Sequence, residues 1–173
     1  MNYYGSKEMA NSWRTVRKNT VQVADDIPAD KYDFRATPDT SSVAELLAHL
    51  AMATHWADQL HFVEKKTGVT MEDFGRYMGD AGKSAAALTT KAAIIDALKT
   101  RGEAFAKQLE SMTETELGTH VAFGAPLPAG SKSRFEMLLG VKEHEMHHRA
   151  QLFLVERMLG IVPHLTRARQ QRS

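Results

Sequence analysis

The sequence predicts an all-α protein built as a four-helix bundle. Four segments carry the periodicity of amphipathic helices, and stretches rich in Gly, Pro, Ser and Thr separate them. We find no strand-rich region and no internal repeat, which makes a bundle the most economical architecture. The 173 residues, 43% hydrophobic and 25% charged, fit one globular domain at residues 1–165, followed by a basic C-terminal tail at 166–173 that we expect to be frayed.

The first two helices have clear boundaries in the sequence. Helix one is expected at residues 7–25 and ends before Pro28. Helix two is expected as one continuous helix over residues 42–66. Ser42 followed by Glu45 forms a capping box, which predicts where helix two begins.

The stretch at residues 69–88 is predicted to be a long loop. It contains three glycines, at positions 75, 79 and 82. Its length exceeds that of a simple connection between two helices, so we interpret it as a crossover or a lid.

Helix three is expected at residues 90–112, with Gly102 as a weak point in its middle. Residues 117–130 contain Pro126 and Pro128, which predicts an irregular segment or a short extended piece.

Helix four is expected to begin near Ser131 or Ser133, with Glu136 as a capping partner. It should continue to about Leu159, where Gly160 stops it.

Composition excludes several classes of function. The formal net charge is +1, without the basic stripe of a typical nucleic-acid-binding domain, so we expect no nucleic-acid partner. The chain has no cysteine, so any metal must be held by His, Asp or Glu. No apolar run approaches the length of a membrane span or a signal peptide, which predicts a cytoplasmic protein without a membrane partner.

One of the eight histidines, His49, lies on what we expect to be the core-facing side of helix two. Residues spaced alternately by three and four form this seam: Ser42, Leu46, His49, Ala53, Trp56, Leu60 and Val63. His55 and His61 should lie about 120° to either side of His49, on the surface or flank of the helix.

The same spacing on helix four selects two further histidines. The stripe consists of Met137, Val141, His144, His148, Leu152, Val155 and Leu159. His144 and His148 are separated by one turn, which lets both imidazoles reach one ion. His147 could pair with His144 instead, but it should lie about 60° off the stripe, so we favour His148.

Three histidines on facing helices allow two interpretations. Each could be a core histidine with its nitrogens satisfied by neighbours, which is the usual state of a single buried histidine. Burying all three without a common partner would be costly, and a shared metal ion would satisfy them together. We therefore predict a metal site at His49, His144 and His148.

The sequence resembles the DinB/YfiT-like family, whose members are described as metal-dependent enzymes. The resemblance extends over essentially the whole chain and rests on Ile27-Pro28, the run from Tyr32 to Pro38, the run from Ser42 to His49, and the run from His144 to Gln151.

The resemblance implies an up-down-down-up bundle with a long crossover between helices two and three. It also implies that one histidine of helix two and a His-x-x-x-His pair of helix four bind a divalent ion, nickel or zinc first, with iron and manganese as further candidates. Relatives include thiol S-transferases that use a low-molecular-weight thiol, isomerases, suspected hydrolases and stress-induced proteins.

Three neutral histidines leave coordination positions open, as in a catalytic site. The predicted function is therefore a metal-dependent hydrolase or thiol S-transferase acting on a small molecule, with a low-molecular-weight thiol as one candidate. The alternative is a non-catalytic stress-response protein in which the ion braces the bundle. Catalytic residues stay unassigned.

Four other residues have a structural and a functional interpretation each. Glu45 is a cap rather than a general base. Gln151 either orients a ligand imidazole or simply packs. Trp56 either lines an apolar pocket or belongs to the core. Arg149 is expected to point away from the metal and to pair with a surface carboxylate or cap.

Helix four carries a second apolar line that must also be buried: Phe135, Leu139, Met146, Ala150 and Phe153. Either it packs within the chain or it forms a two-fold interface. Relatives are often dimers, so we predict a homodimer.

Overall fold

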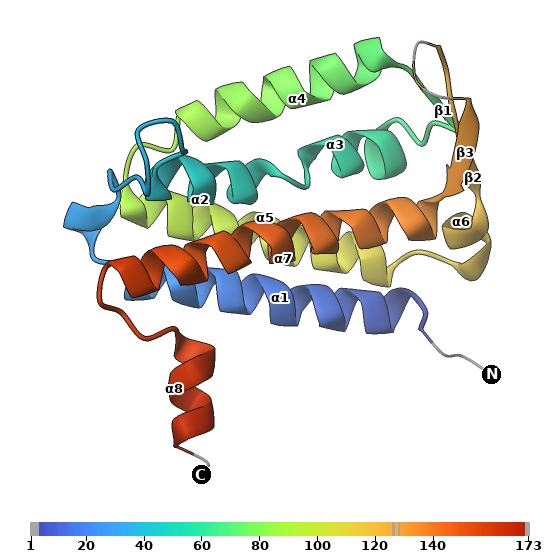
Figure 1. Cartoon of the computed structure of the whole chain (residues 1–173). Coiled ribbons are helices and arrows are strands. Elements are labelled where there is room, and N and C mark those ends of the chain that lie inside the picture. The colour runs from blue at the N-terminus through green and yellow to red at the C-terminus, as the bar shows by residue number, and fades with distance from the viewer. Residues whose placement is uncertain (1–3, 126, 128, 172–173) are drawn as a thin grey trace.

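The computed structural model describes residues 4–125, 127 and 129–171 and confirms the predicted fold class. Four long helical segments form the bundle: α1 (Ser6–Asp26), α2 (Val43–Met52) with its continuation, α5 (Lys91–Glu110) and α7 (Arg134–Met158). In Figure 1, α1 and α7 run from right to left, and α2 and α5 run from left to right. Their order along the chain is therefore up, down, down and up.

The predicted caps begin the helices where the sequence placed them. Ser42 accepts a hydrogen bond from the Glu45 backbone and donates its own backbone N–H to the Glu45 carboxylate. Ser133 caps α7 by accepting from the Glu136 backbone, at 3.2 Å. Gly160 follows α7 with a φ of +77°, a conformation that glycine adopts without strain.

α1 and α5 pack closely against each other in the core of the bundle. Trp13 packs edge to face on Phe105, with ring centroids 5.0 Å apart, and its indole N–H donates to the Gly102 carbonyl at 2.9 Å. Gly102 is therefore a position of close helix contact: a Cβ built there would lie 2.5 Å from the Arg17 side chain.

Helix two is not continuous, contrary to expectation. It stops after α2 and resumes as α3 (His55–Ala57) and the π-helix η2 (Asp58–Val63). The interruption has a tertiary cause. Buried Arg17 donates to the Leu50 carbonyl at 3.1 Å, the acceptor that the Thr54 backbone N–H would use in an α-helix.

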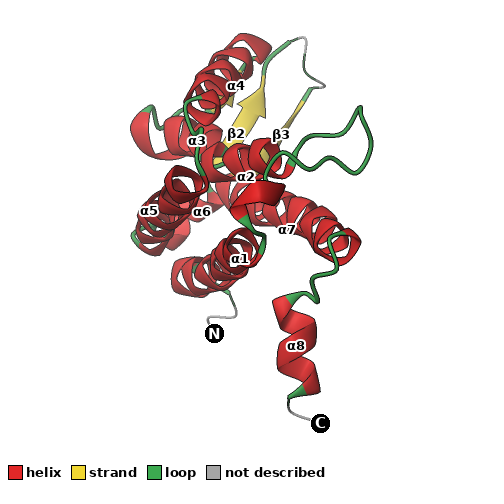
Figure 2. Cartoon of the chain, turned by 90° about the vertical axis from the view of Figure 1, so that its left-hand side faces the viewer, coloured by secondary structure: helices red, strands yellow, loops and turns green. Residues whose placement is uncertain are grey.

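The predicted crossover exists, but its description as a loop is wrong. It forms the helix α4 (Met71–Ala86), which lies over α2 and α3, outside the four-helix core (Figures 1 and 2). Thr70 and Asp73 form a capping box, and buried Tyr77 donates its hydroxyl to Glu64 at 2.8 Å. These interactions outweigh the roughly 1 kcal/mol by which each glycine disfavours a helix.

A small sheet, absent from the sequence prediction, closes one end of the bundle (Figure 1). It consists of β1 (Gly68–Val69), β2 (His120–Phe123) and β3 (Gly130–Ser133) in the order β1-β2-β3. β1 pairs parallel to β2, and β2 pairs antiparallel to β3. Strands of two to four residues are too short to show an alternating pattern.

The segment at 117–130 is thus partly extended, as predicted, and the helix α6 (Glu114–Gly118) precedes it; Pro126 and Pro128 lie outside the described residues. A short 3-10 helix, η1 (Ala29–Lys31), follows α1.

The basic tail is helical rather than frayed through most of its length. The helix α8 (His164–Gln170) begins before the tail and extends into it, and Arg167 pairs with Asp26 at 2.6 Å. In the described part of the chain, no helix has the length and apolar character needed to cross a membrane.

Candidate metal centre

The structure brings the three selected histidines together from two helices. His49 lies in the last turn of α2, and His144 and His148 lie one turn apart in the middle of α7. Nε2 of His144 is 3.1 Å from Nε2 of His49 and 3.1 Å from Nε2 of His148. One nitrogen from each of the three imidazoles lies within 4.8 Å of the others.

The two separations of 3.1 Å fit a shared metal ion. With metal–nitrogen bonds of about 2.0–2.1 Å, two ligand nitrogens lie about 2.9 Å apart at a right angle and about 3.4 Å apart at the tetrahedral angle. The two separations of 3.1 Å fall between these limits. Without an ion, His144 Nε2 offers either one N–H or one lone pair, so it cannot form a well-directed hydrogen bond with both neighbours.

Gln151 fixes the orientation of one imidazole. Its Oε1 lies 2.8 Å from His148 Nδ1, so Nδ1–H donates to the amide and the lone pair of Nε2 faces the cluster. The other end of the amide is 3.4 Å from His147 Nε2. His147 itself is exposed and stays outside the group of three.

The electrostatics of the site favour neutral imidazoles. Burial, and then the neighbouring His148, lowers the pKa of His49. For His144, burial together with His148, His49 and His147 lowers the pKa to about 4. Near neutral pH these two rings therefore keep the lone pairs that a metal needs.

The prediction that His49 faces the core is wrong, whereas the helix-four stripe is buried at Met137, Val141 and Leu152. His49 is exposed and its two partners are half-buried, whereas the buried side of α2 is formed by Val43, Leu47 and Leu50. Alpha-helical spacing identifies residues that share a face, but not what that face contacts. Here the face opens into a cavity.

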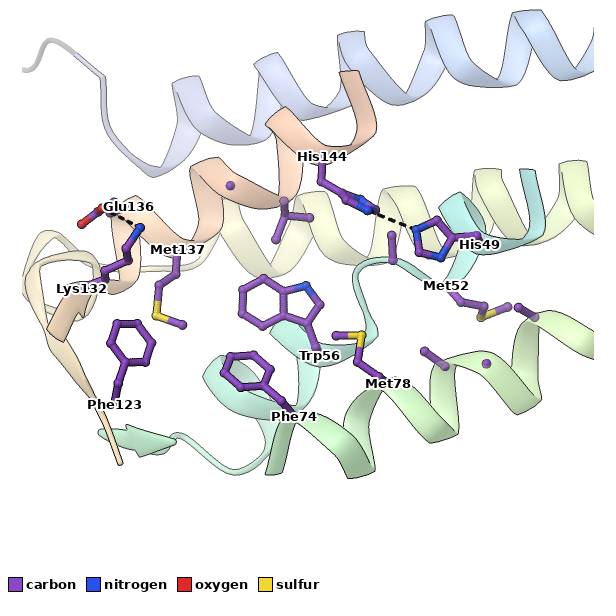
Figure 3. Close-up of a pocket in the computed structure, with 16 residues that line it drawn as sticks. His49, Met52, Trp56, Phe74, Met78, Phe123, Lys132, Glu136, Met137 and His144 are labelled. Carbon is purple, nitrogen blue, oxygen red and sulfur yellow. Dashed lines mark hydrogen bonds and ion pairs between the residues drawn. The ribbon is translucent and has the colours of Figure 1, made fainter. Parts of the chain in front are cut away.

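The cavity has a volume of about 710 Å³ and extends from the histidines toward the sheet (Figure 3). His49 and His144 lie at one end, and Lys132 and Glu136 at the other. Trp56, whose role the sequence left open, lies between them and packs against Phe74 with ring centroids 5.9 Å apart. α4 contributes one wall, and Phe123 of β2 another part.

Sequence reasoning missed the buried ion pair behind the histidines. Glu145, next to His144, is buried and pairs with Arg17 of α1 at 2.7 Å. Arg149 is also buried and donates to the Val16 carbonyl at 3.1 Å, so its predicted surface partner is wrong. The only indication of these buried contacts in the sequence is the spacing of the two residues. Glu145 and Arg149 are four residues apart, on the side of α7 away from the histidines.

His61 is likewise buried rather than on the flank, and burial lowers its pKa to about 4. Val63, predicted for the seam, is 63% exposed. Both lie in η2, beyond the interruption of helix two. The wider π-turns make the 100° step per residue inapplicable there.

Comparison with known proteins identifies the family. Two solved structures share the fold: a DinB-like protein from Bacillus subtilis (21% identity, TM-score 0.66, 88% of this chain and 92% of that chain) and a protein assigned to the DinB family from Exiguobacterium sibiricum (20% identity, TM-score 0.62, 91% and 93%). No curated protein matches significantly. The family model of the DinB superfamily matches residues 12–152. The chain therefore belongs to the DinB superfamily.

Proposed function

We propose that the protein binds one divalent metal ion through His49, His144 and His148. The observation that carries the proposal is the pair of 3.1 Å separations between imidazole nitrogens beside a large cavity. Imidazole ligands suit nickel and zinc, with iron and manganese as further candidates.

We further propose that this centre acts on a small molecule, as a hydrolase or a thiol S-transferase. Three neutral ligands leave coordination positions open, and a bound ion lowers the pKa of a coordinated water or thiol. The chain contributes the three ligands and Gln151, which holds the His148 ring in place. Glu45 is no candidate base, because its carboxylate caps α2 and forms two hydrogen bonds with Arg35.

A second candidate is a non-catalytic, metal-braced protein. It is favoured by the position of the ligands on α2 and α7, since an ion there would tie the two helices together. Loss of thermal stability on chelation, without turnover of any substrate in a panel of esters, amides and thiols, would support it.

The decisive experiment is elemental analysis of protein purified without a histidine tag. The wild type and a His147→Ala variant should carry about one divalent ion per chain, whereas His148→Ala should carry much less. His147→Ala is a matched control, because it removes an exposed imidazole one residue away from a proposed ligand. Equal metal content in all three proteins would refute the assignment.

The homodimer remains a proposal. Much of the second apolar line of α7 is covered within the chain: Phe135 packs on Tyr4, and Phe153 on His164. Met146 stays 44% exposed and Ala150 is exposed as well, so this part of the line is open to a partner. Light scattering that shows a monomer at high concentration would remove the proposal.

A further inference from the structure

The cavity beside the histidines is large enough to hold more than a metal-bound water. Its volume of about 710 Å³ lies within the range of about 300–1,000 Å³ typical of pockets for drug-sized ligands. The histidines occupy only one end of it (Figure 3). The rest of the cavity is therefore free for the body of a ligand.

Most of the cavity wall is apolar. Its large side chains are those of Met52, Trp56, Phe74, Met78, Phe123 and Met137. The charged side chains among the described lining residues are Lys132 and Glu136, which pair with each other at 3.0 Å. Hydroxyl groups in the middle of the cavity would lose their hydrogen bonds to water without replacement.

Two glycines leave room along opposite walls. Gly82 of α4 and Gly140 of α7 both line the cavity, and a Cβ built at either position would meet no atom within 4 Å. Both positions therefore have room for a larger side chain beside the cavity.

The two ends of the cavity define the shape of the ligand. If the proposed metal is bound between neutral histidines, its charge attracts an anionic or lone-pair-bearing head group. The apolar walls favour an uncharged body. A thiol that carries several hydroxyl groups would fit the metal end but not the body of the cavity, because its hydroxyls would be unpaired there.

We infer that the cavity binds an elongated, apolar small molecule with one metal-binding head group, such as an alkyl or aryl monocarboxylate or thiol. The inference rests on the proposed function for the head group only. The body of the ligand is recognised by Trp56, Phe74 and the methionines, independently of any ion.

The test is calorimetric titration of the zinc-loaded protein with decanoate and with butyrate. Decanoate should bind at least about tenfold more tightly, because each buried methylene contributes about 0.8 kcal/mol. Equal affinity for the two acids would overturn the inference, since a metal-only contact does not distinguish chain length.

Variants that carry a larger side chain at a glycine of the cavity wall test whether decanoate binds in the cavity. Gly82→Leu and Gly140→Leu should each weaken decanoate binding about tenfold or more at unchanged metal content. Gly79→Leu is the matched control, because Gly79 is exposed on the same helix as Gly82 and does not line the cavity. It should bind decanoate within about twofold of the wild type. Unchanged binding in both Gly82→Leu and Gly140→Leu would overturn the inference.

Titration of metal-free protein with decanol separates this inference from the proposed function. Decanol has no anionic head group, so it should still bind and should still be excluded by Gly82→Leu. If the protein holds no metal but decanol behaves in this way, the proposed function fails and the cavity inference stands. If metal binds but neither decanoate nor decanol does, the cavity inference fails alone.

Discussion

His148 donates a hydrogen bond from Nδ1 to Gln151 Oε1 at 2.8 Å, and this contact turns its other nitrogen toward His144. Gln151→Ala should therefore lower metal affinity about 10–100-fold, the usual cost of losing such an orienting partner. Competition with a chromophoric chelator measures the change. Gln151→Glu, which keeps an acceptor oxygen, should recover most of the affinity; equal affinity in Gln151→Ala and the wild type would contradict the role.

Metal removal should lower thermal stability. At a free metal concentration about a hundred times its dissociation constant, binding to the folded state alone stabilises by about 2.7 kcal/mol. For a chain of this length that corresponds to a rise in Tm of about 5–10 °C. Scanning calorimetry with and without a chelator measures it. A His148→Ala variant should show no chelator effect, and a shift as large as in the wild type would argue against binding at this site.

Breaking the buried ion pair should cost far more than breaking a surface pair. Arg17→Met leaves Glu145 buried without its cation, which we expect to cost about 3–5 kcal/mol in the free energy of unfolding. Adding Glu145→Leu should recover part of the loss, because no buried charge then remains unpaired.

The control for this pair is Arg14→Met. Arg14 pairs with Glu103 and Glu110 on the surface, so its loss should leave stability nearly unchanged. Urea unfolding of the wild type, Arg14→Met, Arg17→Met and the double variant Arg17→Met with Glu145→Leu measures the four free energies of unfolding. Equal losses for Arg14→Met and Arg17→Met would show that burial does not control the cost.

Glu156 should make the protein less stable at alkaline than at acidic pH. Its side chain is buried, and neither carboxyl oxygen has a hydrogen-bond partner among the described residues. Burial, and then Asp26, raises its pKa from 4.5 to about 7. The unfolded chain therefore releases this proton first, and stability falls as the pH rises from about 4.5 to about 7.

Glu156→Gln removes the loss of stability that the buried carboxyl group causes at high pH. At pH 8 the variant should be more stable than the wild type by about 2–3 kcal/mol at most, and the difference should vanish near pH 4. Urea unfolding across this pH range tests it. A difference that does not change with pH would mean that the carboxyl group is not the cause.

Gly102→Ala should destabilise the protein, although alanine normally favours a helix by about 1 kcal/mol over glycine. The new methyl group would lie 2.5 Å from an Arg17 side chain that is held on three sides, and such overpacking costs about 1–3 kcal/mol. Gly79→Ala, on the exposed side of α4, should instead stabilise by about 0.5–1 kcal/mol. Thermal unfolding of both variants distinguishes the two signs.

The features that could be predicted from the sequence are those that depend on residues close to one another along the chain. The caps at Ser42 and Ser133 are local hydrogen bonds, and the alignment of His144 with His148 follows from uninterrupted α-helical spacing. The spacing of helix two was reliable up to His49. Beyond it, a side chain from α1 ends the regular helix, and nothing within helix two announces that contact.

The misplacement of Arg149 has the same origin. Its acceptor, the Val16 carbonyl, is 133 residues away in the sequence, so no local pattern could reveal it. The glycines of the crossover predict a loop, whereas buried Tyr77 of α4 hydrogen-bonds to Glu64, which lies 13 residues earlier in the chain. In each case tertiary contacts overrode local preference.

Arg17 contacts the residues next to two of the three histidines. Its guanidinium donates to the carbonyl of Leu50, which follows His49, and pairs with Glu145, which follows His144. One rigid, planar group in the core thus acts as a spacer that sets the separation of the two helices from behind. Substitution of Arg17 in α1, a helix that supplies none of the three histidines, should therefore change the spacing of the proposed ligands.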